Sequence, residues 1–298
     1  MQIITLDLNF QNAKNAIASY LVYGSGAPVM VETGPGSTLE TMKVLLTEHG
    51  VALSDIKHVL VTHIHLDHAG AAGWWARQGA QIYVHHVGAP HLIDPSKLLA
   101  SAGRIYGDRM DSLWGEVLSA PAEKVTPLND GDVLEIEGLS FKAIDTPGHA
   151  YHHHTYQVED VAFTGDAAGI HIPGPAFTDL PAPPPEFNLE LWEGTLDRLR
   201  GLDIEAIYPT HFGRVDEWTK QIDNLDVLMH KAAEFVRIRL EDGLDRDAIM
   251  EDYIAWQRKR AEEAGIADVL AKRYDLANPQ YMSVDGLIRY WSKRMAKG

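Results

Sequence analysis

Residues 62–70 contain three histidines and an aspartate at a spacing suited to metal binding. They read Thr-His-Ile-His-Leu-Asp-His-Ala-Gly. His63, His65 and Asp67 are spaced by two, so at the end of a strand their side chains point to one side, whereas His68 turns elsewhere. Neutral imidazole and carboxylate are ligands for zinc, iron or manganese. This segment can therefore offer two imidazoles to one metal ion, and a carboxylate with an imidazole to a second.

Three further segments place a histidine or an aspartate directly after an expected strand. His149 ends the run Thr-Pro-Gly-His, Asp166 ends Thr-Gly-Asp, and His211 ends Pro-Thr-His. In α/β proteins, binding sites form at the carboxyl ends of the strands. We therefore expect these side chains to meet those of residues 63–68 in one site.

The complete pattern, His-x-His-x-Asp-His over residues 63–68 followed by His149, Asp166 and His211, resembles the metallo-β-lactamase superfamily over residues 1–215. The resemblance implies an αββα sandwich, an α/β fold with a binuclear metal site at one edge. It also implies the ligands: His63, His65 and His149 for the first metal, Asp67, His68 and His211 for the second, and Asp166 bridging both. The expected cofactor is two Zn²⁺ per chain, with Fe or Mn as alternatives.

Such a site predicts hydrolysis of a small-molecule substrate. Two cations about 3.5–4 Å apart can ionise a shared water near neutral pH, which makes a metal-bridging hydroxide the nucleophile. Asp67 is expected to orient it. His153 lies four residues after His149, where glyoxalase II-type relatives often place another histidine, and we assign it as a candidate catalytic relay or supporting group. His153 and Tyr151 are the candidates for protonating the leaving atom.

The resemblance favours the glyoxalase II-like and lactonase-like branch, and hence a small ester, thioester or lactone as substrate. One alternative is a mononuclear iron persulfide dioxygenase, in which His63, His149 and Asp166 form a two-histidine, one-carboxylate set. Phosphodiesterase and β-lactamase-type hydrolysis are further alternatives on the same fold. A last alternative is a non-catalytic binding protein on a retained scaffold.

Other residues are weaker candidates. Asp145 is expected either to orient a ligand imidazole or to satisfy backbone donors, and His152 and His154 are expected on the surface or in the sheet. A second set is expected near the mouth of the site or in contact with substrate: His85, His86, His171, Arg104 and Arg109. A third set is expected to pack under loops or to form an apolar pocket wall: Tyr106, Trp114, Phe177 and Phe187.

The elements that must position these residues alternate between strands and helices, which is typical of a layered α/β fold. Strands are expected at residues 17–23, 28–32, 58–62, 81–85, 133–136, 141–145, 156–158, 161–164 and 206–208. Two long insertions, 86–122 and 172–187, are expected to be lids, binding loops or mobile surface. From Asp216 the spacing of apolar residues becomes helical. We therefore expect a catalytic domain at 1–215 and a helical C-terminal region at 216–298.

Composition limits the remaining possibilities. The 298 residues include 42 acids against 26 Lys and Arg, a net charge of −16, which disfavours nucleic acid as a partner. There is no cysteine, so thiolate metal sites, disulfides and cysteine nucleophiles are excluded. The sequence shows neither a signal-peptide pattern nor an apolar run of membrane-spanning length, so a cytoplasmic protein without a membrane partner is expected. The apolar C-terminal helices favour a homodimer.

Overall fold

The computed structural model describes residues 1–296 and contains two β-sheets. The first has the order β1-β2-β3-β4-β5-β6, with β1 (Gln2–Asp7), β2 (Ala18–Tyr23), β3 (Val29–Val31), β4 (His58–Leu60), β5 (Gln81–His85) and β6 (Val125–Leu128). The second has the order β11-β10-β9-β8-β7, with β7 (Val133–Ile136), β8 (Leu139–Asp145), β9 (His154–Val158), β10 (Val161–Gly165) and β11 (Ala206–Pro209). Strands β3 to β6 are parallel to one another, and β11 is parallel to β10, whereas the other pairs are antiparallel.

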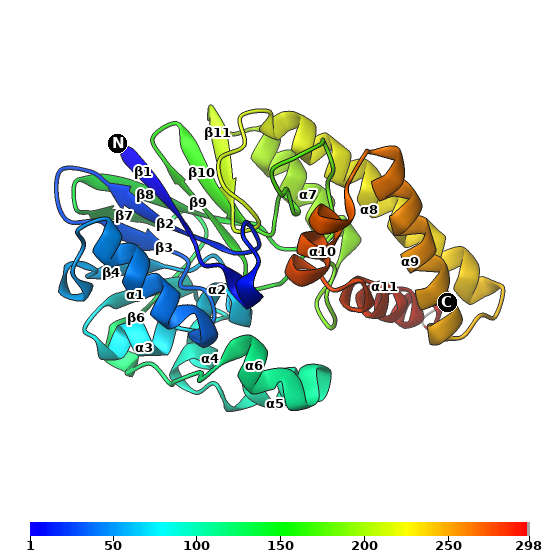
Figure 1. The fold of residues 1–298 in the computed structure, drawn as a ribbon, viewed down its shortest axis with the longest axis horizontal. Helices are drawn as coiled ribbons and strands as arrows, with labels where there is room; N and C mark the ends of the chain where they lie inside the picture. Colours follow the sequence, from blue (N-terminus) through cyan, green and yellow to red (C-terminus); the bar gives the residue numbers. More distant parts are fainter. Residues whose placement is uncertain (297–298) are drawn as a thin grey trace.

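The two sheets pack face to face between layers of helices (Figure 1). The alternation of side chains along β2 shows why both faces are buried. Tyr20 and Val22 point into a cluster shared with Phe141 and Phe163 of the second sheet, whereas Leu21 points to the helices outside the first sheet. This arrangement confirms the αββα sandwich.

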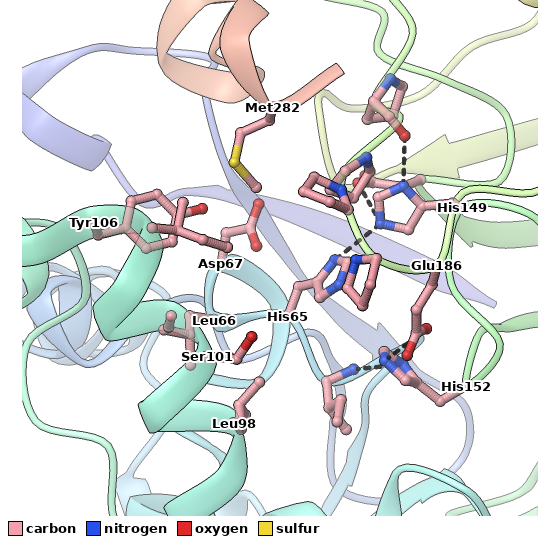
Figure 2. Close-up of a pocket in the computed structure, with 18 of the residues that line it drawn as sticks. His65, Leu66, Asp67, Leu98, Ser101, Tyr106, His149, His152, Glu186 and Met282 are labelled. Atoms are coloured by element: carbon pink, nitrogen blue, oxygen red, sulfur yellow. Dashed lines mark hydrogen bonds and ion pairs between the residues drawn. The ribbon is translucent and has the colours of Figure 1, made fainter. Parts of the chain in front are cut away.

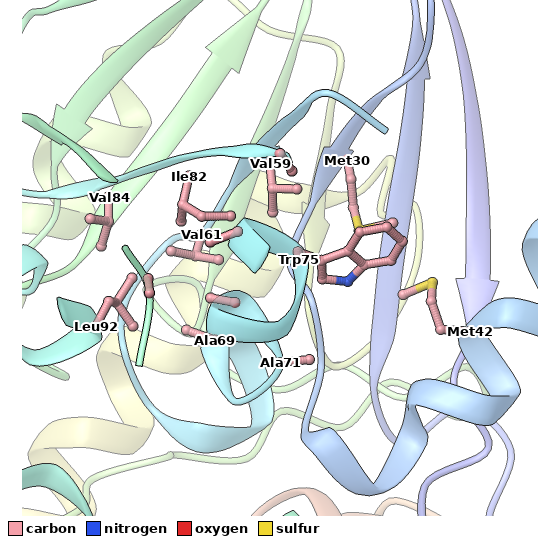
Figure 3. Packing of buried hydrophobic residues seen from close by; sticks show 14 of the residues in the cluster. Met30, Met42, Val59, Val61, Ala69, Ala71, Trp75, Ile82, Val84 and Leu92 are labelled. Atoms are coloured by element: carbon pink, nitrogen blue, oxygen red, sulfur yellow. The ribbon is translucent and has the colours of Figure 1, made fainter. Parts of the chain in front are cut away.

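Helices cover the outer face of the first sheet. They are α1 (Leu39–Glu48), α2 (Leu66–Ala69), α3 (Ala72–Arg77), α4 (Ala89–Ile93), α5 (Ser96–Tyr106) and α6 (Met110–Trp114). Figure 3 shows the fully buried Trp75 of α3 between Met30 of β3 and Met42 of α1. This packing fixes the segment between β4 and α3, which carries the first histidines.

Five helices lie on the side of the second sheet: α7 (Leu189–Arg200), α8 (Trp218–Glu241), α9 (Arg246–Glu263), α10 (Asp268–Ala277) and α11 (Gln280–Met295). Helices α7 and α8 share a core with β11, and α9 and α11 pack on α8. Helix α10 packs on the 170–177 segment through Tyr274. In Figure 1 the five helices lie on the side of the molecule opposite α1 and α3. Their core continues across residue 215, because Trp192 and Leu196 share one cluster with Ile222, Leu225 and Leu287. The expected helical C-terminal extension is confirmed. None of the helices described within residues 1–296 is long and apolar enough to cross a membrane.

The structure corrects some expected elements. The 86–122 insertion is not a loop, because α4, α5 and α6 lie within it, and Leu98, Ala102 and Ile105 form a helical apolar stripe on α5. Residues 172–187 do lack helix and strand, as expected. Strands β1 and β6 and helix α7 were not predicted, although Leu189, Trp192, Leu196 and Leu199 of α7 recur at helical spacing.

Candidate metal centre

Seven side chains from both sheets meet at one edge of the sandwich. β4 of the first sheet leads into His63, and β8, β10 and β11 of the second sheet end just before His149, Asp166 and His211. Asp67 does not continue an extended strand, as the spacing suggested, because it lies with His68 on the short helix α2. The helical turn still brings them to the other ligand candidates.

Three imidazoles form the first group. The distances from His63 Nε2 to His65 Nδ1 and to His149 Nε2 are 3.0 and 3.3 Å, and His149 Nε2 lies 2.9 Å from His65 Nδ1. His149 Nδ1 donates to the carbonyl of Pro181 at 2.7 Å, which leaves Nε2 of the neutral ring free of a proton. Two nitrogens bound at 2.0–2.1 Å to one tetrahedral ion would lie about 3.3 Å apart. The three nitrogens are therefore placed to share one cation.

Burial keeps this group in the form that binds metal. Burial lowers the pKa of His63 and His65 well below the ordinary histidine value, and neighbouring histidines lower both further. Burial also lowers the pKa of His149, although Asp166 opposes the shift. Neutral imidazole is the metal-binding form.

Asp67, His68 and His211 form the second group. Oδ2 of Asp67 lies 3.6 Å from Nε2 of His68 and 3.4 Å from Nε2 of His211. Asp166 stands between the groups: its Oδ2 lies 3.3 Å from His149 Nε2, while its Oδ1 lies 3.5 Å from His68 Nε2. One carboxylate thus faces both groups.

Unpartnered atoms indicate what the centre could hold. In the described part of the chain, His68 Nε2, His211 Nε2 and Asp166 Oδ1 are buried and have no hydrogen-bond partner. Buried polar atoms almost always have a partner, so a cation bound by these atoms accounts for them. The donor set of imidazole and carboxylate fits divalent metal ions of the zinc, iron or manganese type.

Glu32 supports the centre and was missed in the sequence, where nothing marks a single glutamate after a strand. It is 1% exposed, and its backbone has the left-handed φ of 65°. Its Oε1 accepts hydrogen bonds from His68 Nδ1 at 3.3 Å, from Thr210 Oγ1 at 3.2 Å and from Thr62 Oγ1. Glu32 therefore orients His68 and joins the loops after β4 and β11.

His153 lies behind the centre. It is fully buried, its Nδ1 pairs with Thr146 Oγ1 at 2.8 Å, and its Nε2 accepts from the backbone N–H of Asp166 at 3.2 Å. Both ring nitrogens are thus used, and this geometry favours holding Asp166 over proton transfer. Tyr151 is 47% exposed and does not line the pocket. A catalytic role for either residue stays a prediction.

A pocket with a cavity of about 240 Å³ opens onto the centre (Figure 2). Leu98, Ser101 and Tyr106 of α5 form one side of it. Another side is formed by Met282 of α11, by residues 277–279 at the end of α10 and in the α10–α11 linker, and by prolines of the 181–185 segment. The expected apolar wall is therefore confirmed for Tyr106 alone among the named aromatic residues. The others pack elsewhere: Trp114 on Phe10, Phe177 on Tyr274, and Phe187 on Trp192 and Tyr290.

His152 is buried and lines this pocket, contrary to the expected surface or sheet position. Its Nε2 lies 3.4 Å from Oε2 of Glu186, and burial lowers its pKa to about 4. His91 and Lys97 also line the pocket. None of the three was predicted, because their places depend on how α4, α5 and the loop after β8 dock.

Asp145, His154 and His85 form a separate cluster. Asp145 Oδ1 lies 2.7 Å from His154 Nε2 and 3.4 Å from His85 Nε2, so Asp145 orients neither of the two proposed metal groups. His85 Nδ1 accepts from the backbone N–H of Val87, which places the ring proton on Nε2, toward Asp145. This protonation suits a structural hydrogen bond better than metal binding. The remaining mouth candidates also lie off the pocket wall in the described structure: His86, His171, Arg104 and Arg109.

Comparisons with known proteins agree with this arrangement. A sequence model of the metallo-β-lactamase superfamily matches residues 14–211. The chain is 26% identical over 200 residues to the metallo-β-lactamase fold-containing protein ST1585 of Sulfurisphaera tokodaii, a match that covers 66% of this chain and 72% of ST1585. It is 25% identical over 207 residues to an atrochrysone carboxyl ACP thioesterase of Aspergillus fumigatus, covering 69% of this chain and 39% of that protein.

The chain spans about half the length of the fungal lactamase-like relatives. Among solved structures, the metallo-β-lactamase family protein TTHA1429 of Thermus thermophilus matches with a TM-score of 0.71 at 21% identity, over 99% of this chain and 94% of that one. This structural match shows the fold, including the C-terminal helices.

Proposed function

Because the chain belongs to the metallo-β-lactamase superfamily, which includes metal-dependent hydrolases, we propose that it hydrolyses a small ester, thioester or lactone at a binuclear metal centre. The observation that carries the proposal is the pair of donor groups joined by Asp166, with three buried atoms that lack any other partner. The three unpartnered atoms lie in the second group and on Asp166, and the three clustered nitrogens of the first group supply the ligands for another ion.

The position of each residue indicates the role that we propose for it. His63, His65 and His149 would hold one cation, Asp67, His68 and His211 the other, and Asp166 would contact both. When bound, the cations would supply Lewis acidity and a water ionised near neutral pH. Asp67 is about one-fifth exposed and lines the pocket, so its carboxylate can accept a hydrogen bond from a water facing the substrate.

The pocket supports an acyl substrate with an apolar part. Beside the metal centre its surface is formed by Leu66, Leu98, Ile105, Met282 and the prolines at 181 and 183–185. Such a surface would bind an acyl or ring group while the carbonyl faces the centre. The thioesterase among the relatives supports a thioester or a related acyl substrate. The net charge of −16 disfavours polyanionic substrates such as nucleic acids.

Elemental analysis of protein purified without added metal, combined with assays of ester, thioester, lactone and phosphodiester substrates, tests the proposal. We expect about two zinc or manganese ions per chain in the wild type. The Asp166→Ala variant should bind less metal and should lose hydrolytic activity. Asp203→Ala, at an exposed aspartate outside the centre, is the matched control. One iron per chain with oxygen uptake would instead support the persulfide dioxygenase, and absence of metal after reconstitution would refute the metal centre.

A further inference from the structure

The 179–182 segment separates the metal centre from the C-terminal helices. On one side, the carbonyl of Pro181 accepts the hydrogen bond from His149 Nδ1 at 2.7 Å. This carbonyl belongs to the same planar peptide as the N–H of Ala182, and the preceding peptide, Leu180–Pro181, has no N–H and offers only the Leu180 carbonyl. The orientation of the Pro181 carbonyl therefore depends on what holds Leu180 and Ala182.

The C-terminal helices hold both neighbours. Ser283 Oγ of α11 donates to the carbonyl of Leu180 at 2.7 Å and accepts from the backbone N–H of Ala182 at 3.3 Å. Asn278 Nδ2 in the α10–α11 linker donates to the same Leu180 carbonyl at 2.9 Å. Ser283 and Asn278 are both buried, so water cannot readily replace these hydrogen bonds.

Two further contacts show how closely α11 and the α10–α11 linker pack against the 179–182 segment. Asn278 Nδ2 also donates to Asp179 Oδ2 at 2.8 Å, which fixes the start of the segment. A Cβ atom at Gly286 would lie 1.9 Å from the carbonyl oxygen of Ala182, so only glycine lets α11 come this near. The helix backbone thus packs directly on the segment that supports His149.

We propose that Ser283 and Asn278 are positioning residues for the metal ligand His149, and that the α10–α11 segment is therefore part of the metal centre. The inference rests on the proposed function. A partner on the second nitrogen of a ligand histidine fixes its tautomer and ring orientation, and loss of such a partner typically weakens metal binding 10–100-fold. Ser283 and Asn278 act one step further out, by fixing the carbonyl that is this partner.

The test compares Ser283→Ala with Ser292→Ala, an exposed serine on the same helix. Zn²⁺ affinity is measured by chelator competition, and the Co²⁺-substituted proteins are compared by their visible spectra. We expect one of the two ions to bind about 10-fold more weakly or worse in Ser283→Ala, with a changed Co²⁺ spectrum, and wild-type values in Ser292→Ala. Asn278→Ser, which removes the other donor to Leu180, makes the same comparison if Ser283→Ala folds poorly.

The outcomes separate this inference from the proposed function. Two tightly bound ions and an unchanged spectrum in both Ser283→Ala and Asn278→Ser would overturn the positioning role and leave the binuclear centre intact. Wild-type protein that binds no metal would overturn both.

Discussion

Replacing Glu32 by glutamine should weaken metal binding without removing any ligand. The substitution conserves volume but removes the negative charge that His68 Nδ1, Thr62 Oγ1 and Thr210 Oγ1 share. The backbone N–H of Thr62 donates to Oε2 of Glu32 at 3.4 Å. In glutamine, the NH₂ group would take the place of this oxygen, so that two donors would face each other. One of the four contacts therefore becomes repulsive, and the others lose charge assistance.

The magnitude follows from the hydrogen bond to His68. Burial lowers the pKa of His68, but Asp67, Asp166 and Glu32 together raise it well above the ordinary value. With a cation on Nε2, the ring keeps its proton on Nδ1 and donates it to Glu32. A hydrogen bond to a charged group contributes about 1.5–3 kcal/mol and a neutral one about 0.5–1.5 kcal/mol, so replacing the carboxylate by an amide loses about 1–1.5 kcal/mol. Since about 1.4 kcal/mol corresponds to a factor of ten, we expect Zn²⁺ affinity at the second group to fall about 5- to 10-fold.

Chelator competition with Zn²⁺ measures this loss, and Glu48→Gln, at an exposed glutamate, is the control. The first group should retain its affinity more fully, because its nitrogens do not contact Glu32. Denaturant unfolding of the metal-free proteins separates the effect on stability from the effect on metal. If Glu32→Gln bound both ions as tightly as wild type, the argument that Glu32 orients His68 would be refuted.

Three other substitutions test the cluster of Asp145, His154 and His85, the turn before His149, and the pocket. Burial and His154 lower the pKa of His85 to about 4, so the folded state resists protonation. The free energy of unfolding of the metal-free wild type should therefore fall as the pH falls from about 6.5 to 4. In denaturant titrations, His85→Gln should lose about 1–3 kcal/mol less than wild type over that range. The same pH dependence in both proteins would contradict this. Gly148 has a φ of 132°, and a Cβ there would lie 2.3 Å from Cβ of Trp192. Gly148→Ala should therefore lower the free energy of unfolding by at least about 2 kcal/mol. A wild-type value would show that the turn can adapt. Met282→Ala enlarges the pocket and should raise kcat/KM for bulky relative to short acyl groups about tenfold, while an unchanged ratio would place the acyl group elsewhere.

The resemblance of the motif predicted the superfamily and the αββα sandwich, and the seven side chains were expected to meet because the segments that carry them follow short apolar strands. Strand ends are local features, and parallel strands bring them to a common edge. That the seven bind metal, and that a domain boundary lies at residue 215, stay predictions. The metal-dependent hydrolase class agrees with membership of the superfamily.

What the sequence did not predict depends on docking between distant segments. Glu32 becomes a supporting group only because β3 lies beside β4, and nothing near it in the chain marks that role. Ser283 and Asn278 follow the centre by more than sixty residues, and helical periodicity does not show what a helix packs against. His154 lies in β9, one of its two expected positions, whereas His152 was misplaced because its burial in the pocket depends on how the loop after β8 packs.

The position of the centre across both sheets also bears on how the protein unfolds. His63 and His65 follow β4 of the first sheet and His149 follows β8 of the second, so a bound cation would be a reversible cross-link between the two halves of the sandwich. Such a cross-link closes a long chain loop and reduces the entropy of the unfolded state as long as the ion stays bound. Neither sheet could then separate before the ion leaves. The lifetime of the folded protein would therefore follow the supply of metal, with faster unfolding and proteolysis under metal starvation.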